Sequence, residues 1–189
     1  MKLSAILAVA ICIASAKQAI AEPAEPILQI LGDIQAQLPP GMVMRLPTQS
    51  AVEGVQDALY ATVETTETDE VRVELGSTPN CTSRACMRGY FSSTPAEVEH
   101  PMDDSIEATE IGRAPITLAD GIVGDFITLE GVRGPFSIVR WQQDEQIYVV
   151  SVIPDPSPLL EGMTMQQSAR QRILDFAISM ATEPPLTKE

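Results

Sequence analysis

Several residue types are scarce in this chain of 189 residues. It contains a single histidine, His100, and three cysteines, and aromatic residues make up only 4% of it. Basic residues are few as well, since 12 Lys and Arg stand against 26 Asp and Glu, for a formal net charge of −14. Such an acidic surface disfavours nucleic acid and anionic membrane as partners, because both are polyanions. The scarcity of aromatic rings argues against a carbohydrate-stacking surface, and we expect the acidic charge to serve solubility.

The motifs of common catalytic and cofactor sites are absent from the sequence. It has no G-x-S-x-G elbow, Walker loop, dinucleotide fingerprint or H-E-x-x-H. A Ser-His-Asp triad would have to use His100, which lies in a polar segment. The D-x-[DN]-x-[DN]-G order that gives Ca²⁺ a preformed cage is missing too. We therefore expect no enzymatic activity, no cofactor and no metal site. A hydrolase with paired carboxylates stays open as a third hypothesis, because the sequence does not reveal distances between acids.

The longest apolar run lies at the amino terminus and is typical of an export signal. Met1-Lys2 is a short basic region, Leu3 to Ala16 is apolar, and Ala19-Ile-Ala21 supplies a cleavage pattern. We predict a signal peptide over residues 1–21, with cleavage after Ala16 as the alternative. A run of about 14 residues is too short to cross a ~30 Å hydrocarbon core, so we expect no transmembrane segment after cleavage.

Cleavage after residue 21 would remove two lysines and no acid, which changes the net charge from −14 to −16. The predicted location is periplasmic or secreted, or the thylakoid lumen if the source is a cyanobacterium.

Residues 22–182 are expected to form a single α+β domain, followed by a disordered tail over 183–189. Its first element is a short amphipathic helix, since apolar residues recur on one helical face at Ile27, Leu31, Ile34 and Leu38. Residues 42–46 read as a strand, and residues 48–57 as a loop or one helical turn. Residues 59–64 and 71–75 alternate apolar and polar side chains, which predicts a hairpin with one face in water.

The segment from Gly121 to Ile153 predicts three consecutive strands. The last of them, Ile147–Ile153, is apolar at nearly every position and is therefore expected to be central in the sheet. Thr164 and Gln167 match a capping box at the start of a final helix. That helix should cover the sheet with an apolar stripe of Met165, Ala169, Ile173, Phe176, Ala177 and Met180. The predicted fold is an antiparallel sheet of about six to eight strands covered by an N-terminal and a C-terminal helix.

Two cysteines, Cys81 and Cys86, remain after signal cleavage and lie in a turn-rich segment. A pair in an exported chain most simply forms a disulfide. Redox and metal readings compete with it, but the spacing is wider than C-x-x-C, and two thiols alone cannot complete a tetrahedral zinc site. Arg84 and Arg88 stand beside the pair and are the candidate contact with a partner. The alternative is that they neutralise nearby acids.

The segment over residues 94–110 is rich in Pro, Asp and Glu and predicts an acidic loop or a long connection across the sheet. A solvated loop is favoured there over a loose site for a divalent cation.

Three stretches of the chain resemble small exported cyanobacterial proteins of uncharacterised function. They are Leu38-Pro-Pro-Gly41, Asn80–Cys86, and Ile116–Gly121 leading to Trp141 and Tyr148. This resemblance implies a periplasmic or lumenal location. The last third, with a tryptophan-bearing strand, a tyrosine-bearing strand and a final helix, is similar to lipoprotein-carrier and sigma-factor-regulator-like envelope proteins. That similarity implies a half-barrel covered by helices that binds acyl chains or partner peptides.

The leading functional hypothesis is a non-enzymatic envelope protein that binds a protein or a surface, with the Cys81–Cys86 loop presented to the partner. The alternative is a carrier of an apolar ligand or lipid, with a cavity between the sheet and the final helix. Four residues would line that cavity: Trp141, Tyr148, Phe176 and Met180. A pocket of several hundred Å³ at these side chains would distinguish the carrier.

Overall fold

The computed structural model of the protein describes residues 23–55, 59–66, 69–83, 85–98, 108–132, 134–153 and 160–188. The predicted signal peptide lies outside these residues. The fold is α+β, as predicted: a seven-stranded antiparallel sheet, a small two-stranded sheet and several helices. The helical elements are α1 Glu25–Leu28, α2 Leu31–Gln37, α3 Gln49–Glu53, η1 Ala119–Gly121 and α4 Met165–Thr182. Within the described residues, no helix combines the length and apolar character needed to cross a membrane.

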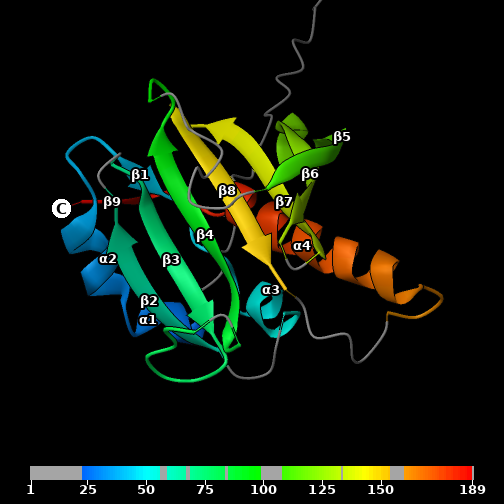
Figure 1. Ribbon diagram of the computed structural model, residues 1–189. Helices are drawn as coiled ribbons and strands as arrows, with labels where there is room; N and C mark the ends of the chain where they lie inside the picture. Colours follow the sequence, from blue (N-terminus) through cyan, green and yellow to red (C-terminus); the bar gives the residue numbers. More distant parts are fainter. Residues whose placement is uncertain are drawn as a thin grey trace, which may run out of the picture.

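The large sheet has the strand order β2-β3-β4-β8-β7-β6-β5 (Figure 1). Its strands are β2 Tyr60–Thr65, β3 Val71–Gly76, β4 Met87–Pro95, β5 Thr109–Thr117, β6 Val123–Gly131, β7 Gly134–Gln143 and β8 Gln146–Val152. Two meanders, β2-β3-β4 and β5-β6-β7-β8, are joined because their last strands pair with each other. The predicted hairpin over 59–75 and the three predicted strands after Gly121 are confirmed. Strand β8 is central and buried at every position.

The turns between these strands explain their sharp reversals. Asp144 and Glu145 have φ of 52° and 60° and connect β7 to β8 directly, since Gln143 pairs with Gln146. Two consecutive positive φ values fit a turn whose twist matches that of the flanking strands. The acidic loop predicted over 94–110 is shorter than expected, because β4 extends to Pro95 and β5 begins at Thr109. Residues 99–107, including His100, lie outside the described residues.

The N-terminal apolar stripe is divided between two short helices instead of one. Helix α1 ends at Leu28, and α2 begins at Leu31 after a break in which Ile30 has non-helical backbone angles. Ile27, Ile34 and Leu38 are nevertheless fully buried, so the predicted apolar face is the one that packs. The strand expected over 42–46 contracts to β1 Val43–Met44, and the turn expected over 48–57 contains α3.

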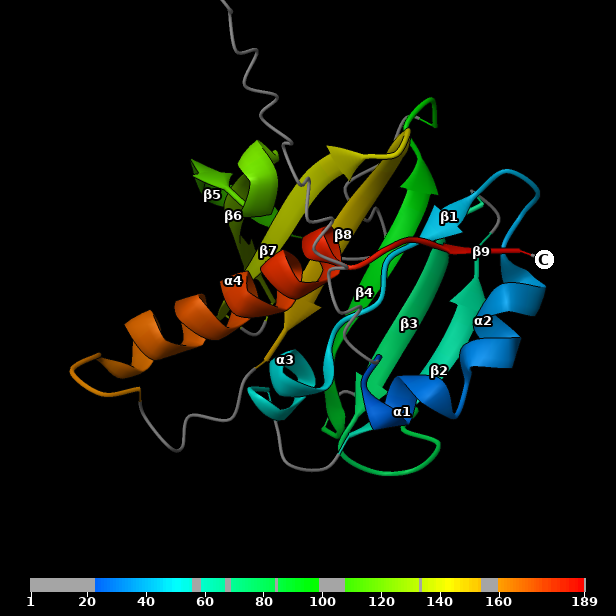
Figure 2. The same cartoon turned by 180° about the vertical axis from the view of Figure 1, so that it is seen from behind.

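Helices α1 to α4 and the small sheet lie on one side of the large sheet (Figure 2). We call this side the helix face and the opposite side the far face. Val73, Phe91, Val150 and Val139 pair across four strands on the helix face and are completely buried. Phe176 of α4 packs against Phe91 with a ring-centroid distance of 5.8 Å. A smaller apolar cluster lies on the far face, formed by Ile127, Leu129, Ile138, Ile147 and Val149.

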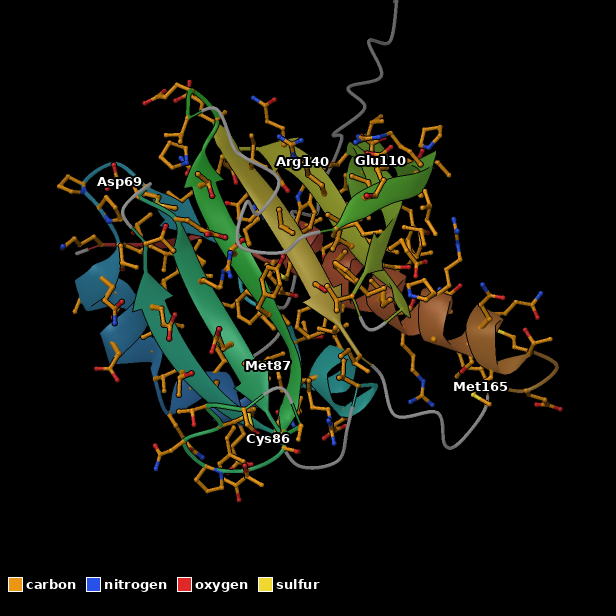
Figure 3. The ribbon with its side chains drawn as sticks, viewed as in Figure 1. Asp69, Cys86, Met87, Glu110, Arg140 and Met165 are labelled. Carbon is orange, nitrogen blue, oxygen red and sulfur yellow. A yellow bond between two sulfur atoms is a disulfide. The ribbon has the colours of Figure 1, made fainter. Side chains whose placement is uncertain are left out.

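The first turns of α4 differ from the prediction. The capping box of Thr164 and Gln167 is present, but Met165 is 61% exposed because the helix begins beyond the edge of the sheet (Figure 3). Ser168 and Arg172 are buried instead. The Arg172 guanidinium donates to the Gly54 carbonyl at 2.8 Å, which ties α4 to the end of α3.

The carboxyl end is ordered where the sequence predicts a disordered tail over 183–189. Leu186–Thr187 form β9, which pairs with β1. Arg45, which is 8% exposed, donates to Asp144 at 2.7 Å and to the backbone carbonyls of Ala181 and Glu183. The end of α4 and the chain that leaves it are therefore held by a buried guanidinium, a contact that a local sequence pattern does not reveal.

Candidate binding surface beside the disulfide loop

The loop between β3 and β4 is closed by the predicted disulfide. The sulfur atoms of Cys81 and Cys86 are 2.06 Å apart, and their Cα atoms are 5.8 Å apart. The Ser77 backbone donates to the Cys86 carbonyl at 2.8 Å, which closes the base of the loop. A turn follows, because the amides of Cys86 and Met87 both donate to the Ser83 carbonyl at 3.2 Å. The loop is thus a small fixed structure at the end of the sheet opposite the turn that bears Asp69 (Figure 3).

Gly76, the last residue of β3, allows the loop to fold back onto the sheet. A Cβ atom at this position would lie 2.5 Å from the Cβ of Cys81. Carbon atoms do not approach this closely, so any side chain at Gly76 would push the disulfide away. The glycine and the disulfide are therefore parts of one local arrangement.

A hollow lies beside the disulfide, and the empty space in it, including its open mouth, is about 190 Å³. Its lining residues come from β2, β3, the disulfide loop and the start of β4: Tyr60, Thr62, Glu74, Leu75, Gly76, Thr78, Asn80, Cys81 and Met87. The register places these residues together. Tyr60, Gly76 and Met87 pair in one row across the sheet, and the Cys81 side chain occupies the place over Gly76 between the two large side chains. Thr62 and Glu74 pair in the adjacent row on the same face.

Glu74 is the one charged residue among those that line the hollow. Partial burial raises the pKa of its carboxyl group above the ordinary value of 4.5, and the nearby Glu64 raises it further, while Arg72 acts in the opposite direction. Arg72 is engaged elsewhere: it forms an ion pair with Glu70 at 3.0 Å and lies over the Tyr90 ring at 4.5 Å. Within the described part of the chain, no group donates a hydrogen bond to the Glu74 carboxylate.

Of the two arginines named as candidate partner contacts, Arg88 is described and Arg84 lies outside the described residues. Arg88 is half-buried, and its Nη1 donates to the carbonyls of Ala85 and Met87 at 3.4 and 3.2 Å. These hydrogen bonds connect Arg88, near the start of β4, to the last part of the disulfide loop.

The four residues proposed to line an apolar cavity belong to the core. Trp141 is 2% exposed, and Tyr148, Phe176 and Met180 are fully buried. The rings of Trp141 and Tyr148 stack with centroids 5.2 Å apart and planes inclined by 17°. Burial raises the pKa of Tyr148 to about 12, and the charge of Asp144 contributes in the same direction. The structure thus brings these four side chains together beneath α4, in contact with other core residues.

Sequence reasoning named the disulfide but missed the hollow beside it. Tyr60 and Glu74 come from strands that precede the cysteines, and only the β2–β3 register places them next to Gly76. One signal was present: a glycine at the end of a strand, five residues before a cysteine, marks a close approach of the chain. In the described ranges, no three His, Cys, Asp or Glu residues are grouped so that they could hold a metal ion.

Comparison of the chain with protein-family models, with curated proteins and with solved structures finds no match.

Proposed function

We propose that this protein is a non-enzymatic component of the cell envelope that binds a protein partner through the disulfide loop and the adjoining hollow. The observation that carries the proposal is the fixed, exposed loop over Gly76, which forms one wall of a depression on the far face. Thr78, Asn80 and Thr82 project from this loop into solvent. A loop that is already fixed by a disulfide loses little conformational entropy when a partner binds it, and this favours binding.

The size and chemistry of the hollow support a protein partner over a carried lipid. Drug-sized ligands occupy pockets of about 300–1,000 Å³ lined mainly by apolar side chains. The comparable volume of the hollow is only about 10 Å³, about the space of one water molecule, and its lining includes Thr62, Glu74, Thr78 and Asn80. The apolar-ligand carrier remains the alternative hypothesis. We place it second because the four residues that it would use belong to one packed core cluster and are at most 2% exposed.

Photo-crosslinking in the cell that makes the protein tests this proposal. A photoreactive amino acid replaces Thr82 in the loop and, in a matched control, Gln166 on the first turn of α4, since both positions are exposed. We expect discrete adducts with one or a few proteins from position 82, and these should weaken in the Cys81→Ser/Cys86→Ser variant. Adducts of equal yield from both positions, or none from position 82, would contradict the proposal.

A further inference from the structure

The lining of the hollow has an apolar part and an acidic part, arranged by the sheet register. Tyr60 and Met87 stand on either side of Gly76 in one row, and Glu74 follows in the next row on the same face. Tyr60 is 44% exposed, so much of its ring is accessible. Because the Cys81 side chain covers Gly76, a group that docks on this surface would lie along the exposed Tyr60 ring and reach the carboxylate of Glu74 in the next row.

The charge of the hollow has no compensating base in its own lining. Glu74 is the one residue of the lining that is charged at neutral pH, and Arg72 lies against Glu70 and Tyr90. Thr62, Thr78 and Asn80 line the same space, and their side chains carry oxygens that can accept hydrogen bonds. This set offers acceptors and negative charge, and it lies on a chain whose net charge is −14.

We infer that a lysine or arginine side chain of the partner docks at the mouth of the hollow, with its aliphatic part along the exposed Tyr60 ring and its cationic head at Glu74. This inference rests on the proposed function, because it names the group that the partner presents. Lys and Arg bury their methylene stems along apolar surface while their heads stay at polar groups. The Tyr60 ring adds an attraction for the cation if the head lies over its face.

Selection from a random heptapeptide library on the immobilised full chain, with its disulfide intact, tests the inference. We expect the selected peptides to share one Lys or Arg at a fixed position. A synthetic peptide of the selected sequence is then titrated against the wild type and three variants. Glu74→Gln should weaken binding about tenfold, the effect of losing one charge-assisted hydrogen bond at a partly exposed site.

The second variant, Thr62→Arg, keeps Glu74 and tests whether the peptide occupies the surface beside it. Thr62 pairs directly with Glu74 and is exposed, so an arginine there supplies an internal cation and should compete with the peptide. Glu130→Gln is the matched control, since it removes an equal charge from an exposed position on β6 and should leave affinity unchanged. Binding should also weaken as ionic strength rises from about 0.1 M to about 1 M, because salt screens exposed charges.

The outcomes separate the inference from the proposed function. Selected peptides without a basic residue, or a basic preference that Glu74→Gln leaves unchanged, would overturn the inference. If those peptides still lose binding in the Cys81→Ser/Cys86→Ser variant, the loop remains the binding surface. A library that yields no binding peptide, together with no crosslink from position 82, contradicts both.

Discussion

At the scale of single residues, Glu74 combines a proposed binding role with a cost in stability. Its carboxylate is partly buried, near the acid Glu64, and not hydrogen-bonded by any described group. Functional sites often retain charged groups that lack a partner in the folded chain. Such groups lower stability, but they remain available to bind a ligand. The raised pKa of Glu74 fits the proposed contact with a basic side chain of the partner.

The sign of the effect of Glu74 on stability follows from its pKa. Because the folded pKa lies above 4.5, the charged form is disfavoured in the folded state, and Glu74 lowers the free energy of unfolding at about pH 7. This penalty is relieved as pH falls through the raised pKa and is absent below the unfolded value. We expect Glu74→Gln to raise the urea midpoint at about pH 7 and to match the wild type at about pH 3.5.

Glu110 is the control for this prediction, because its pKa is shifted in the opposite direction to that of Glu74. A hydrogen bond from Arg113 lowers the pKa of Glu110, so its stabilising effect is present at neutral pH and is lost as pH falls through the lowered pKa. Glu110→Gln should therefore lower the midpoint at about pH 7. Equal shifts of the same sign in both variants would contradict the assignment of these two environments.

Any side chain at Gly89 would clash with the backbone of the paired strand β8. Gly89 has a φ of 132°, and a Cβ atom there would lie 2.0 Å from the Ser151 carbonyl oxygen of the paired strand. We expect Gly89→Ala to lower the free energy of unfolding by about 3 kcal/mol or more, at the upper end for single substitutions. Gly32→Ala is the control, because space is open there in α2 and alanine favours a helix by about 1 kcal/mol. Urea unfolding measures both, and a Gly89→Ala protein as stable as the wild type would be inconsistent with this packing.

At the scale of elements, we expect the disulfide loop to be a local feature of a sheet that folds without it. The loop closes only a few residues, and the chain-entropy model assigns such a closure about 2 kcal/mol. We expect Cys81→Ser/Cys86→Ser to lower the free energy of unfolding by about this amount, with far-ultraviolet circular dichroism unchanged. Faster hydrogen exchange should be confined to residues 77–87. Loss of the folded state would show that the loop supports the whole sheet.

Arg45 connects three elements whose sequence positions are far apart. It binds Asp144 in the β7–β8 turn and the carbonyls at the end of α4, close to the strand β1 that precedes it. Arg45→Ala leaves these acceptors without a donor, so we expect a loss of about 2 kcal/mol, typical of hydrogen bonds to a charged group. A double-mutant cycle with Asp144→Ala should give a positive coupling energy. Additive effects of the two substitutions would indicate that the pair is not a unit.

At the scale of the whole molecule, the packing beneath α4 separates the two functional hypotheses. Phe176 is fully buried against Phe91, in one cluster with Trp141, Tyr148 and Met180. Large-to-small changes in such a core cost about 3–5 kcal/mol for phenylalanine. We expect Phe176→Ala to lose stability in this range by urea unfolding. A loss below about 1 kcal/mol would instead indicate a loosely filled space and favour the carrier.

The sequence predicts elements better than it predicts their partners. Alternation, the capping box and the apolar Ile147–Ile153 run identify β2, β3, β8 and α4, because each pattern is set within a few residues. The pairing of β4 with β8 joins residues about sixty positions apart, and no local pattern specifies it. The β9 strand and the exposure of Met165 depend on Arg45 and on the sheet edge, which are also distant in sequence. The hollow follows the same rule, since it exists only where the β2–β3 register meets the disulfide.

The most direct test of the binding surface is a chemical-shift map of the full chain, labelled with ¹⁵N, on addition of the library-selected basic peptide. We predict that the largest shifts fall on the amides of Tyr60, Gly76 and Asn80 and disappear in Thr62→Arg. Shifts concentrated instead around Trp141, Tyr148 and Phe176, beneath α4, would contradict the binding surface proposed at the disulfide loop and favour a ligand site in the core.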